Sequence, residues 1–236
     1  MKLLHWLLGI LCAFCLMILF LITSVEAVAY WTPGYYEREY EKYHVTDAAH
    51  MEMDDLLEVT DEMMAYLRGD REDLHVMTVV DGQPREFFNA REIAHMEDVR
   101  GLFLGAIALR RVCAAAAVLC VVLMALLKAD VRRLLPRALC VGTGLFFLLA
   151  TVVGGVIASD FSRYFIVFHH IFFDNDLWIL NPATDLLINI VPEPFFSDTA
   201  LRIGLTFGGM VLVLFALCLY LARRNGKARK NPVSND

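Results

Sequence analysis

The sequence predicts an all-α membrane protein with four transmembrane helices and both termini in the cytoplasm. A small mixed α/β extracytoplasmic cap and an aromatic interfacial loop complete this fold class. Apolar residues make up 58% of the 236 residues, against about 45–50% in a typical soluble domain. They are gathered into long runs, and short basic segments lie beside those runs. A helix of about 20 apolar residues crosses the hydrocarbon core of a bilayer.

Four apolar runs are long enough to be transmembrane helices. The first has a longer apolar core than the roughly 7–15 residues of a signal peptide, so we expect it to stay attached. Arg110 and Arg111 interrupt the second run, which makes it the weakest. All six cysteines fall inside the runs, where a free cysteine acts as a small hydrophobe. The predicted helices cover residues 1–24, 102–127, 138–158 and 203–222.

The basic segments set the expected orientation. Residues 128–137 and the tail 223–236 are rich in lysine and arginine, which places them in the cytoplasm. Residues 25–101 and 159–202 then face outward. The first of these outward segments carries 19 acidic against 7 basic residues.

The outward segment 25–101 is expected to form the cap. Thr46 or Asp47 can cap an amphipathic helix that extends to about Leu67. A β-rich stretch then meets Asp81-Gly82, a strong signal for a short hairpin. The two strands of this hairpin are predicted at His75–Val80 and Pro84–Phe88.

The end of the cap gathers polar side chains. Asn89 followed by Glu92 is typical of a reciprocal helix cap. On the helix that follows, Glu92, His95 and Asp98 share one face, and Arg91 lies one turn from His95. Glu92 or Asp98 is therefore expected to orient His95.

The loop 159–202 contains a second histidine position, His169-His170. The loop is highly aromatic and interrupted by prolines, so it is predicted to be interfacial or re-entrant. Histidines at both outward sites can exchange protons near neutral pH. Consecutive helical side chains diverge by about 100°, so only one of His169 and His170 is expected to face a shared site. A surface role for His95 and an aromatic-like interfacial role for the pair remain the simpler alternatives.

Several motifs are spread over nearly the whole chain. They are Tyr36-x-x-Glu39-Tyr40-x-Lys42-Tyr43, Arg85-Glu-Phe-Phe88, Arg91-Glu-Ile-Ala-His95-Met-x-Asp98, Phe168-His169-x-Ile-Phe-Phe173-x-Asn175-Asp176-x-Trp178, and the segment Pro182–Phe196 with Asp185 and Pro192-Glu193-x-Phe195-Phe196. Together they resemble the lipoprotein intramolecular transacylases of low-GC Gram-positive bacteria.

The resemblance implies a specific reaction. The sn-2 acyl chain of an S-diacylglyceryl-cysteine would move to the α-amine of that cysteine, giving an N-acyl, S-monoacylglyceryl (lyso) lipoprotein. It implies His95 as general base and His169 as oxyanion partner or acid, although these roles can be reversed. Supporting residues are expected to be Asp98, Glu92, Arg91 and His170. Candidates for contact with substrate are Asn175, Asp176, Trp178, Arg110 and Arg111.

The implied partners are a diacylglyceryl-modified lipoprotein N-terminus in the outer leaflet and membrane lipid, with no nucleic acid, cofactor or metal. The implied location is the bacterial cytoplasmic membrane, with the site facing outward. Two other classes stay open from the residues alone. One is an intramembrane metallohydrolase with histidine and Asp98 ligands, and the other is a non-enzymatic lipid or peptide sensor.

Overall fold

The computed structural model describes residues 2–227, which are mostly helical with one two-stranded sheet. The chain divides into two compact units. The helical unit comprises the described residues within 1–25, 108–158 and 203–236, and the mixed unit comprises residues 26–107 and 159–202. Most of the predicted basic tail 223–236 lies outside the described residues.

Four helices are long and apolar enough to cross a membrane, as predicted. Their bounds extend past the predicted spans because flanking polar turns continue the helices. Ala90–Leu126 is one uninterrupted helix that joins the cap helix to the second span. Val131–Ser159 already includes most of the predicted loop 128–137, with Pro136 inside the helix. The four helices are α1 (Lys2–Ala29), α5 (Ala90–Leu126), α6 (Val131–Ser159) and α9 (Glu193–Lys227).

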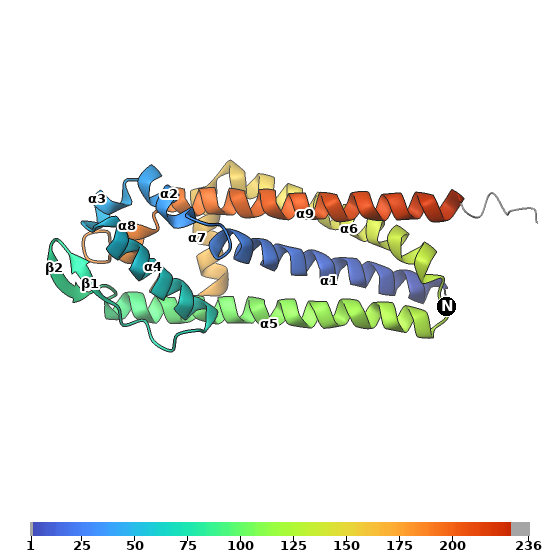
Figure 1. Cartoon of the computed structure of the whole chain (residues 1–236), viewed down its shortest axis with the longest axis horizontal. Helices are drawn as coiled ribbons and strands as arrows, with labels where there is room; N and C mark the ends of the chain where they lie inside the picture. The colour runs from blue at the N-terminus through green and yellow to red at the C-terminus, as the bar shows by residue number, and fades with distance from the viewer. Residues whose placement is uncertain (1, 228–236) are drawn as a thin grey trace, which may run out of the picture. The chain divides into compact units, whose positions relative to one another are not determined.

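Small side chains form the centre of the helical unit, where the four helices lie side by side (Figure 1). A Cβ at Gly9 would come within 2.4 Å of the Ala138 Cβ, and one at Gly142 within 2.5 Å of the Ala13 Cβ. Helices in lipid associate through such small residues. The cysteines pack here as small apolar groups, as their positions in the sequence indicate; the buried ones are Cys12, Cys15, Cys113, Cys120 and Cys218.

The mixed unit begins with three short helices, and the structure corrects one prediction here. Instead of one helix from about Thr46 to Leu67, there are two segments separated at His50, which has a φ of 54°. The His50 carbonyl accepts a hydrogen bond from the Asp81 amide, 3.0 Å away, so the break is held by the hairpin. The three helices are α2 (Tyr35–Lys42), α3 (Val45–Ala49) and α4 (Met53–Arg68).

The predicted hairpin is confirmed, with shorter strands than expected. Strands β1 (Met77–Val80) and β2 (Gln83–Glu86) pair antiparallel in the register Val80 with Gln83. Asp81 and Gly82 both have positive φ, 52° and 70°, which a two-residue type I′ turn requires.

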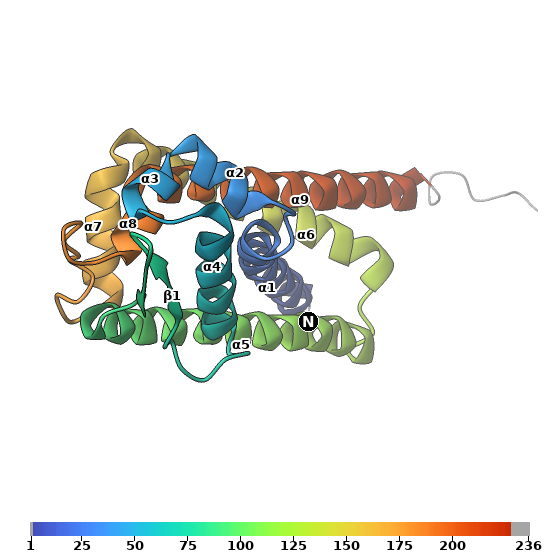
Figure 2. The same ribbon diagram turned by 60° about the vertical axis from the view of Figure 1, so that its left-hand side comes forward.

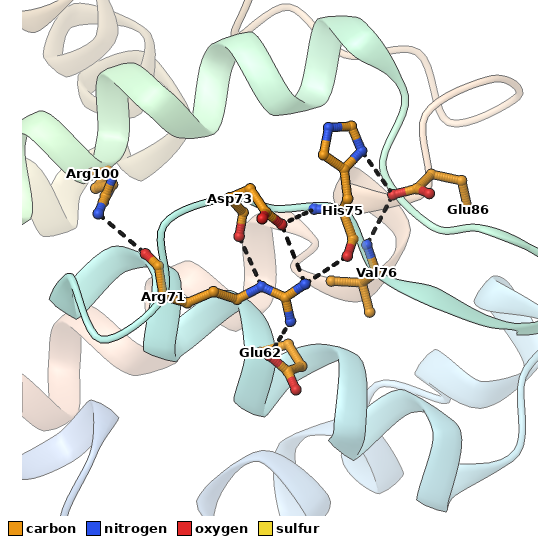
Figure 3. A network of polar contacts seen from close by, with 7 residues as sticks. All are labelled: Glu62, Arg71, Asp73, His75, Val76, Glu86 and Arg100. Carbon is orange, nitrogen blue, oxygen red and sulfur yellow. Dashed lines mark hydrogen bonds and ion pairs between the residues drawn. The ribbon is translucent and has the colours of Figure 1, made fainter.

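A polar network centred on Arg71 ties α4 to the segment before the hairpin (Figure 3). The guanidinium donates to the Glu62 carboxylate, to the Asp73 carbonyl at 2.8 Å and to the His75 carbonyl at 2.6 Å. Arg100 of α5 donates to the Arg71 carbonyl at 3.1 Å. The network thereby connects this segment to α5, beside which α4 lies in both views (Figures 1 and 2).

The remaining elements of the mixed unit come from the second outward segment. Helix α7 (Phe161–Phe172) is capped by Asp160, whose side chain accepts from the Arg163 amide. An irregular loop follows as far as α8 (Leu187–Ile190). The aromatic segment is therefore half helix and half loop.

Candidate active site

His95 lies in the second turn of α5, which begins with the predicted reciprocal cap. The Asn89 side-chain oxygen accepts from the Arg91 and Glu92 amides at 2.9 and 3.0 Å. The Glu92 carboxylate accepts from the Asn89 amide at 2.7 Å. His95 itself is buried, and its Nδ1 has no hydrogen-bond partner within residues 2–227. A buried ring nitrogen without a partner can form a hydrogen bond to a bound molecule.

His169 lies on α7 and is also buried, with an exposed fraction of 8%. Its Nδ1 is 2.7 Å from the Phe165 carbonyl oxygen. A carbonyl can only accept, so Nδ1 carries the proton in this bond. In the neutral ring, Nε2 then holds the lone pair. His170 is exposed instead, as the divergence of consecutive helical side chains predicts.

The two buried imidazoles meet inside the mixed unit. Their ring centroids lie 6.3 Å apart, and both rings contact Phe173, at 5.3 Å from His95 and 5.6 Å from His169. The sequence predicts that the two histidine motifs meet, but it does not single out Phe173 as a side chain that contacts both rings.

Trp178 covers one face of His169. The indole and imidazole are stacked, with centroids 4.7 Å apart and planes 29° from parallel. His170 meets the indole edge-on at 5.2 Å. Trp178, one of the substrate-contact candidates, therefore belongs to the histidine cluster.

The loop after α7 is fastened to the start of α5 by buried carboxylates. Glu92 is fully buried, and its second oxygen accepts from the Leu187 amide at 2.6 Å. Asp185 accepts from the Asn89 side chain at 2.8 Å and from the Asn181 amide at 2.7 Å. Within the described residues Glu92 makes no hydrogen bond to His95. The expected orienting contact is thus replaced by a clamp on the loop.

The other candidates are divided between the two units. Asp98 accepts from the Asn175 side chain at 2.9 Å, and Arg91 donates to the Asp176 carbonyl. These contacts hold the beginning of the loop that carries Trp178. Arg110 and Arg111 belong to the helical unit, where Arg110 is half-buried and Arg111 exposed.

Burial governs the protonation of His169. Loss of hydration lowers the pKa of His169 below its usual 6.5, and the nearby His170 adds to the shift, while the Phe165 carbonyl opposes it. The ring is therefore neutral at physiological pH. Over residues 2–227, no group of three or more His, Cys, Asp or Glu side chains is arranged to hold a metal ion.

Fold and site together define an integral membrane protein with a pair of buried histidines in its mixed unit. The sequence model of the family described as lipoprotein intramolecular transacylase Lit matches residues 10–196. The chain belongs to this family, and is thus an enzyme of intramolecular acyl transfer on lipoproteins.

Solved structures share the fold. Lipoprotein intramolecular transacylase Lit from Bacillus cereus superposes with a TM-score of 0.78 at 21% identity, covering 96% of this chain and 100% of that chain. Two variants of the same B. cereus protein, with one histidine replaced by alanine or by arginine, each give a TM-score of 0.75 at 21% identity. The alanine variant covers 94% of this chain and 96% of its own, and the arginine variant 95% and 94%. A search of curated protein sequences gives no significant match.

Proposed function

We propose that the protein moves the sn-2 acyl chain of an S-diacylglyceryl-cysteine to the α-amine of the same cysteine, with His169 and His95 at the reacting atoms. One observation carries the proposal. Two buried imidazoles lie 6.3 Å apart, and the Nδ1 of one donates to a backbone carbonyl, which leaves its Nε2 free to accept a proton.

The structure favours the opposite of the roles that the resemblance implies, with His169 as the base and His95 as the oxyanion partner. His169 is the general base, because the bond from Nδ1 to Phe165 fixes the tautomer whose Nε2 carries the lone pair. His95 is the oxyanion partner, because its buried Nδ1 has no partner within the described residues and can present an N–H to the ester oxygen. Asp98 and Glu92 act through the loop and the helix start, and Asn175 and Asp176 hold the segment before Trp178.

These two residues can account for every proton that moves in the reaction. The neutral α-amine attacks the sn-2 ester carbon, and a nitrogen–carbon bond forms. His169 takes a proton from the attacking nitrogen, and the imidazolium returns that proton to the glyceryl oxygen as the carbon–oxygen bond breaks. Donor and acceptor belong to one molecule, so the protein's main task is to hold the substrate in the attack geometry. Such pre-orientation contributes up to about 7–11 kcal/mol in favourable cases.

The site is proposed to face the outer leaflet of the bacterial cytoplasmic membrane. The short basic segment 128–137 supports this orientation, which would give the mixed unit access to lipoproteins displayed outside. Arg110 and Arg111 remain candidates for contact with the lipid part of the substrate. An arginine within a span is expensive unless it snorkels, pairs or lines a polar cavity, and a cavity for the substrate is the role that we propose.

The test uses full-length protein in lipid with a synthetic S-diacylglyceryl-cysteinyl peptide. The shift conserves mass, so tandem mass spectrometry must locate the acyl chain on the amine. His169→Ala is expected to lower the rate by about 10²–10⁴-fold, as removal of a general base does. Val167→Ala, at an exposed position of the same helix, is the control and should retain nearly the full rate. Equal losses in both variants, or an unmodified amine with the wild-type protein, would contradict the proposal.

A further inference from the structure

The indole nitrogen of Trp178 is a buried donor that the protein does not use. Nε1 is shielded from solvent and has no hydrogen-bond partner among the described residues. Tryptophan nitrogen can donate but not accept, so only an acceptor from elsewhere can satisfy it. Buried donors without partners are rare in native structures and each one requires an explanation.

The position of the ring is fixed by contacts around it. The indole stacks on His169 at 4.7 Å, and His170 meets it edge-on. Three residues earlier, Asn175 donates to Asp98 at 2.9 Å and accepts from the Leu177 amide at 3.0 Å. The indole ring is therefore held against the imidazole that we assign as the base.

The missing acceptor has a definite chemistry. During the proposed acyl shift, the ester carbonyl oxygen gains negative charge while the attacking nitrogen is next to His169. Fixed donors aimed at such an oxygen are among the largest contributions to catalysis of acyl transfer, and they commonly act in pairs. His95 supplies one donor in the proposed mechanism, and the unpaired Nε1–H of Trp178 is available as a second.

We infer that Trp178 is a catalytic residue whose Nε1–H donates to the oxyanion formed on the sn-2 ester carbonyl, beside the N–H of His95. This inference rests on the proposed function, since it assumes that the ester reacts between the two histidines. It also explains why a tryptophan stacks on His169, where a phenylalanine would provide the same kind of apolar cover without an unsatisfied donor.

The experiment replaces the N–H and preserves the ring. Incorporation of 3-benzothienylalanine at position 178 puts a sulfur in place of Nε1–H in a side chain of nearly the same shape. With the synthetic lipopeptide, we expect kcat to fall by about 10²-fold, the usual effect of removing one oxyanion donor. KM should change little, because the interaction forms only in the transition state. The Tm should not fall, because the group removed has no partner in the free protein.

The same replacement at Trp31, an exposed tryptophan in the mixed unit, is the control and should leave kcat unchanged. Trp178→Phe provides a second variant, which loses both the N–H and part of the stacking area. If the benzothienyl protein keeps kcat within about twofold of wild type, or if its loss of rate comes with a lower Tm, Trp178 acts by packing and the inference is wrong.

The proposed function is judged separately in this assay. A wild-type protein that leaves the amine free overturns both proposals. An active wild type with an inactive His169→Ala variant and an active benzothienyl protein overturns the role of Trp178 alone. The pH dependence of the rate adds a further criterion. Loss of the donor should scale the curve down, whereas a disturbed His169 would shift its acid limb.

Discussion

At the scale of single residues, helical periodicity leaves His169 and His170 equivalent, and the structure buries only one of them. Both residues have the same ring and adjacent positions, so no periodicity argument selects one. In the structure His169 is buried against Phe173, while His170 is exposed. The hydrogen bond from Nδ1 to Phe165 also sets the tautomer, and residue types alone cannot reveal a bond to a backbone carbonyl.

The lowered pKa of His169 predicts the pH dependence of kcat/KM. A lowered pKa means that the neutral base persists to lower pH than an ordinary histidine. The amine substrate loses its proton near pH 7.7–8.0, so a logarithmic plot should have a slope of about one below that range. The slope should steepen to about two only below pH 6.5, where His169 becomes protonated. Steepening at or above pH 6.5 would contradict burial as the governing cause.

Among the described residues, two titratable side chains adjoin His169. His95 approaches from α5, and His170 follows on α7. Substitution of the exposed neighbour, His170→Gln, removes one contribution that lowers the pKa of His169. The acid limb should therefore move slightly upward in this variant without a large change in the maximal rate.

At the scale of elements, the contacts that join α5 to the loop after α7 were the least accessible to sequence reasoning. The reciprocal cap of Asn89 and Glu92 was predictable because it is local, and it is confirmed. The second bond of Glu92 goes to the Leu187 amide. No local pattern indicates an interaction across that length of chain, so the sequence predicts only that Glu92 or Asp98 orients His95.

The clamp makes a prediction about stability. Glu92→Gln keeps the shape of the side chain but turns an acceptor oxygen into an NH₂ group facing a backbone N–H. Leaving the backbone N–H of Asn89 or Leu187 without its acceptor should lower the free energy of unfolding by about 1–3 kcal/mol. Thermal unfolding of the full-length protein would show this loss as a lower Tm. Glu97→Gln, on the exposed side of the same helix, is the control. A Tm equal to that of the control would mean that the clamp contributes little.

In the cap, too, the features set by neighbouring residues were predictable from the sequence, and a feature set by a contact distant in the chain was not. The Asp81-Gly82 turn follows from the backbone preferences of two residues, and its pairing is confirmed. The helix predicted from about Thr46 is interrupted because the His50 carbonyl bonds to the Asp81 amide of the hairpin. Composition favours an unbroken helix there, and a tertiary hydrogen bond overrides it.

At the scale of the whole molecule, hydropathy was sufficient to identify the four long helices, because length and apolar composition are what a bilayer selects. The ends of the helices were harder to predict from the sequence. Polar residues before and after each run stay helical, as in α5, where the helix of the site and the second span are continuous. Hydropathy marks the part of a helix that suits lipid and says nothing about where its hydrogen bonds stop.

The orientation of the molecule in the membrane remains a prediction, and cysteine labelling in whole cells can test it. Five native cysteines are buried and Cys140 is half-buried within the helices, so the wild-type protein should react little. Glu72→Cys, at an exposed position of the mixed unit, should react with a membrane-impermeant maleimide in intact cells. Asp130→Cys, in the short connection between α5 and α6, should react only after the membrane is opened.

The physical reason is the excess of Lys and Arg around that connection, which resists translocation. Replacing Asp130 removes no positive charge, so the substitution should not alter the orientation that it reports. Labelling of Asp130→Cys in intact cells, with Glu72→Cys protected, would reverse the topology. It would also place the histidine pair on the cytoplasmic side, where outer-leaflet lipoproteins could not reach it.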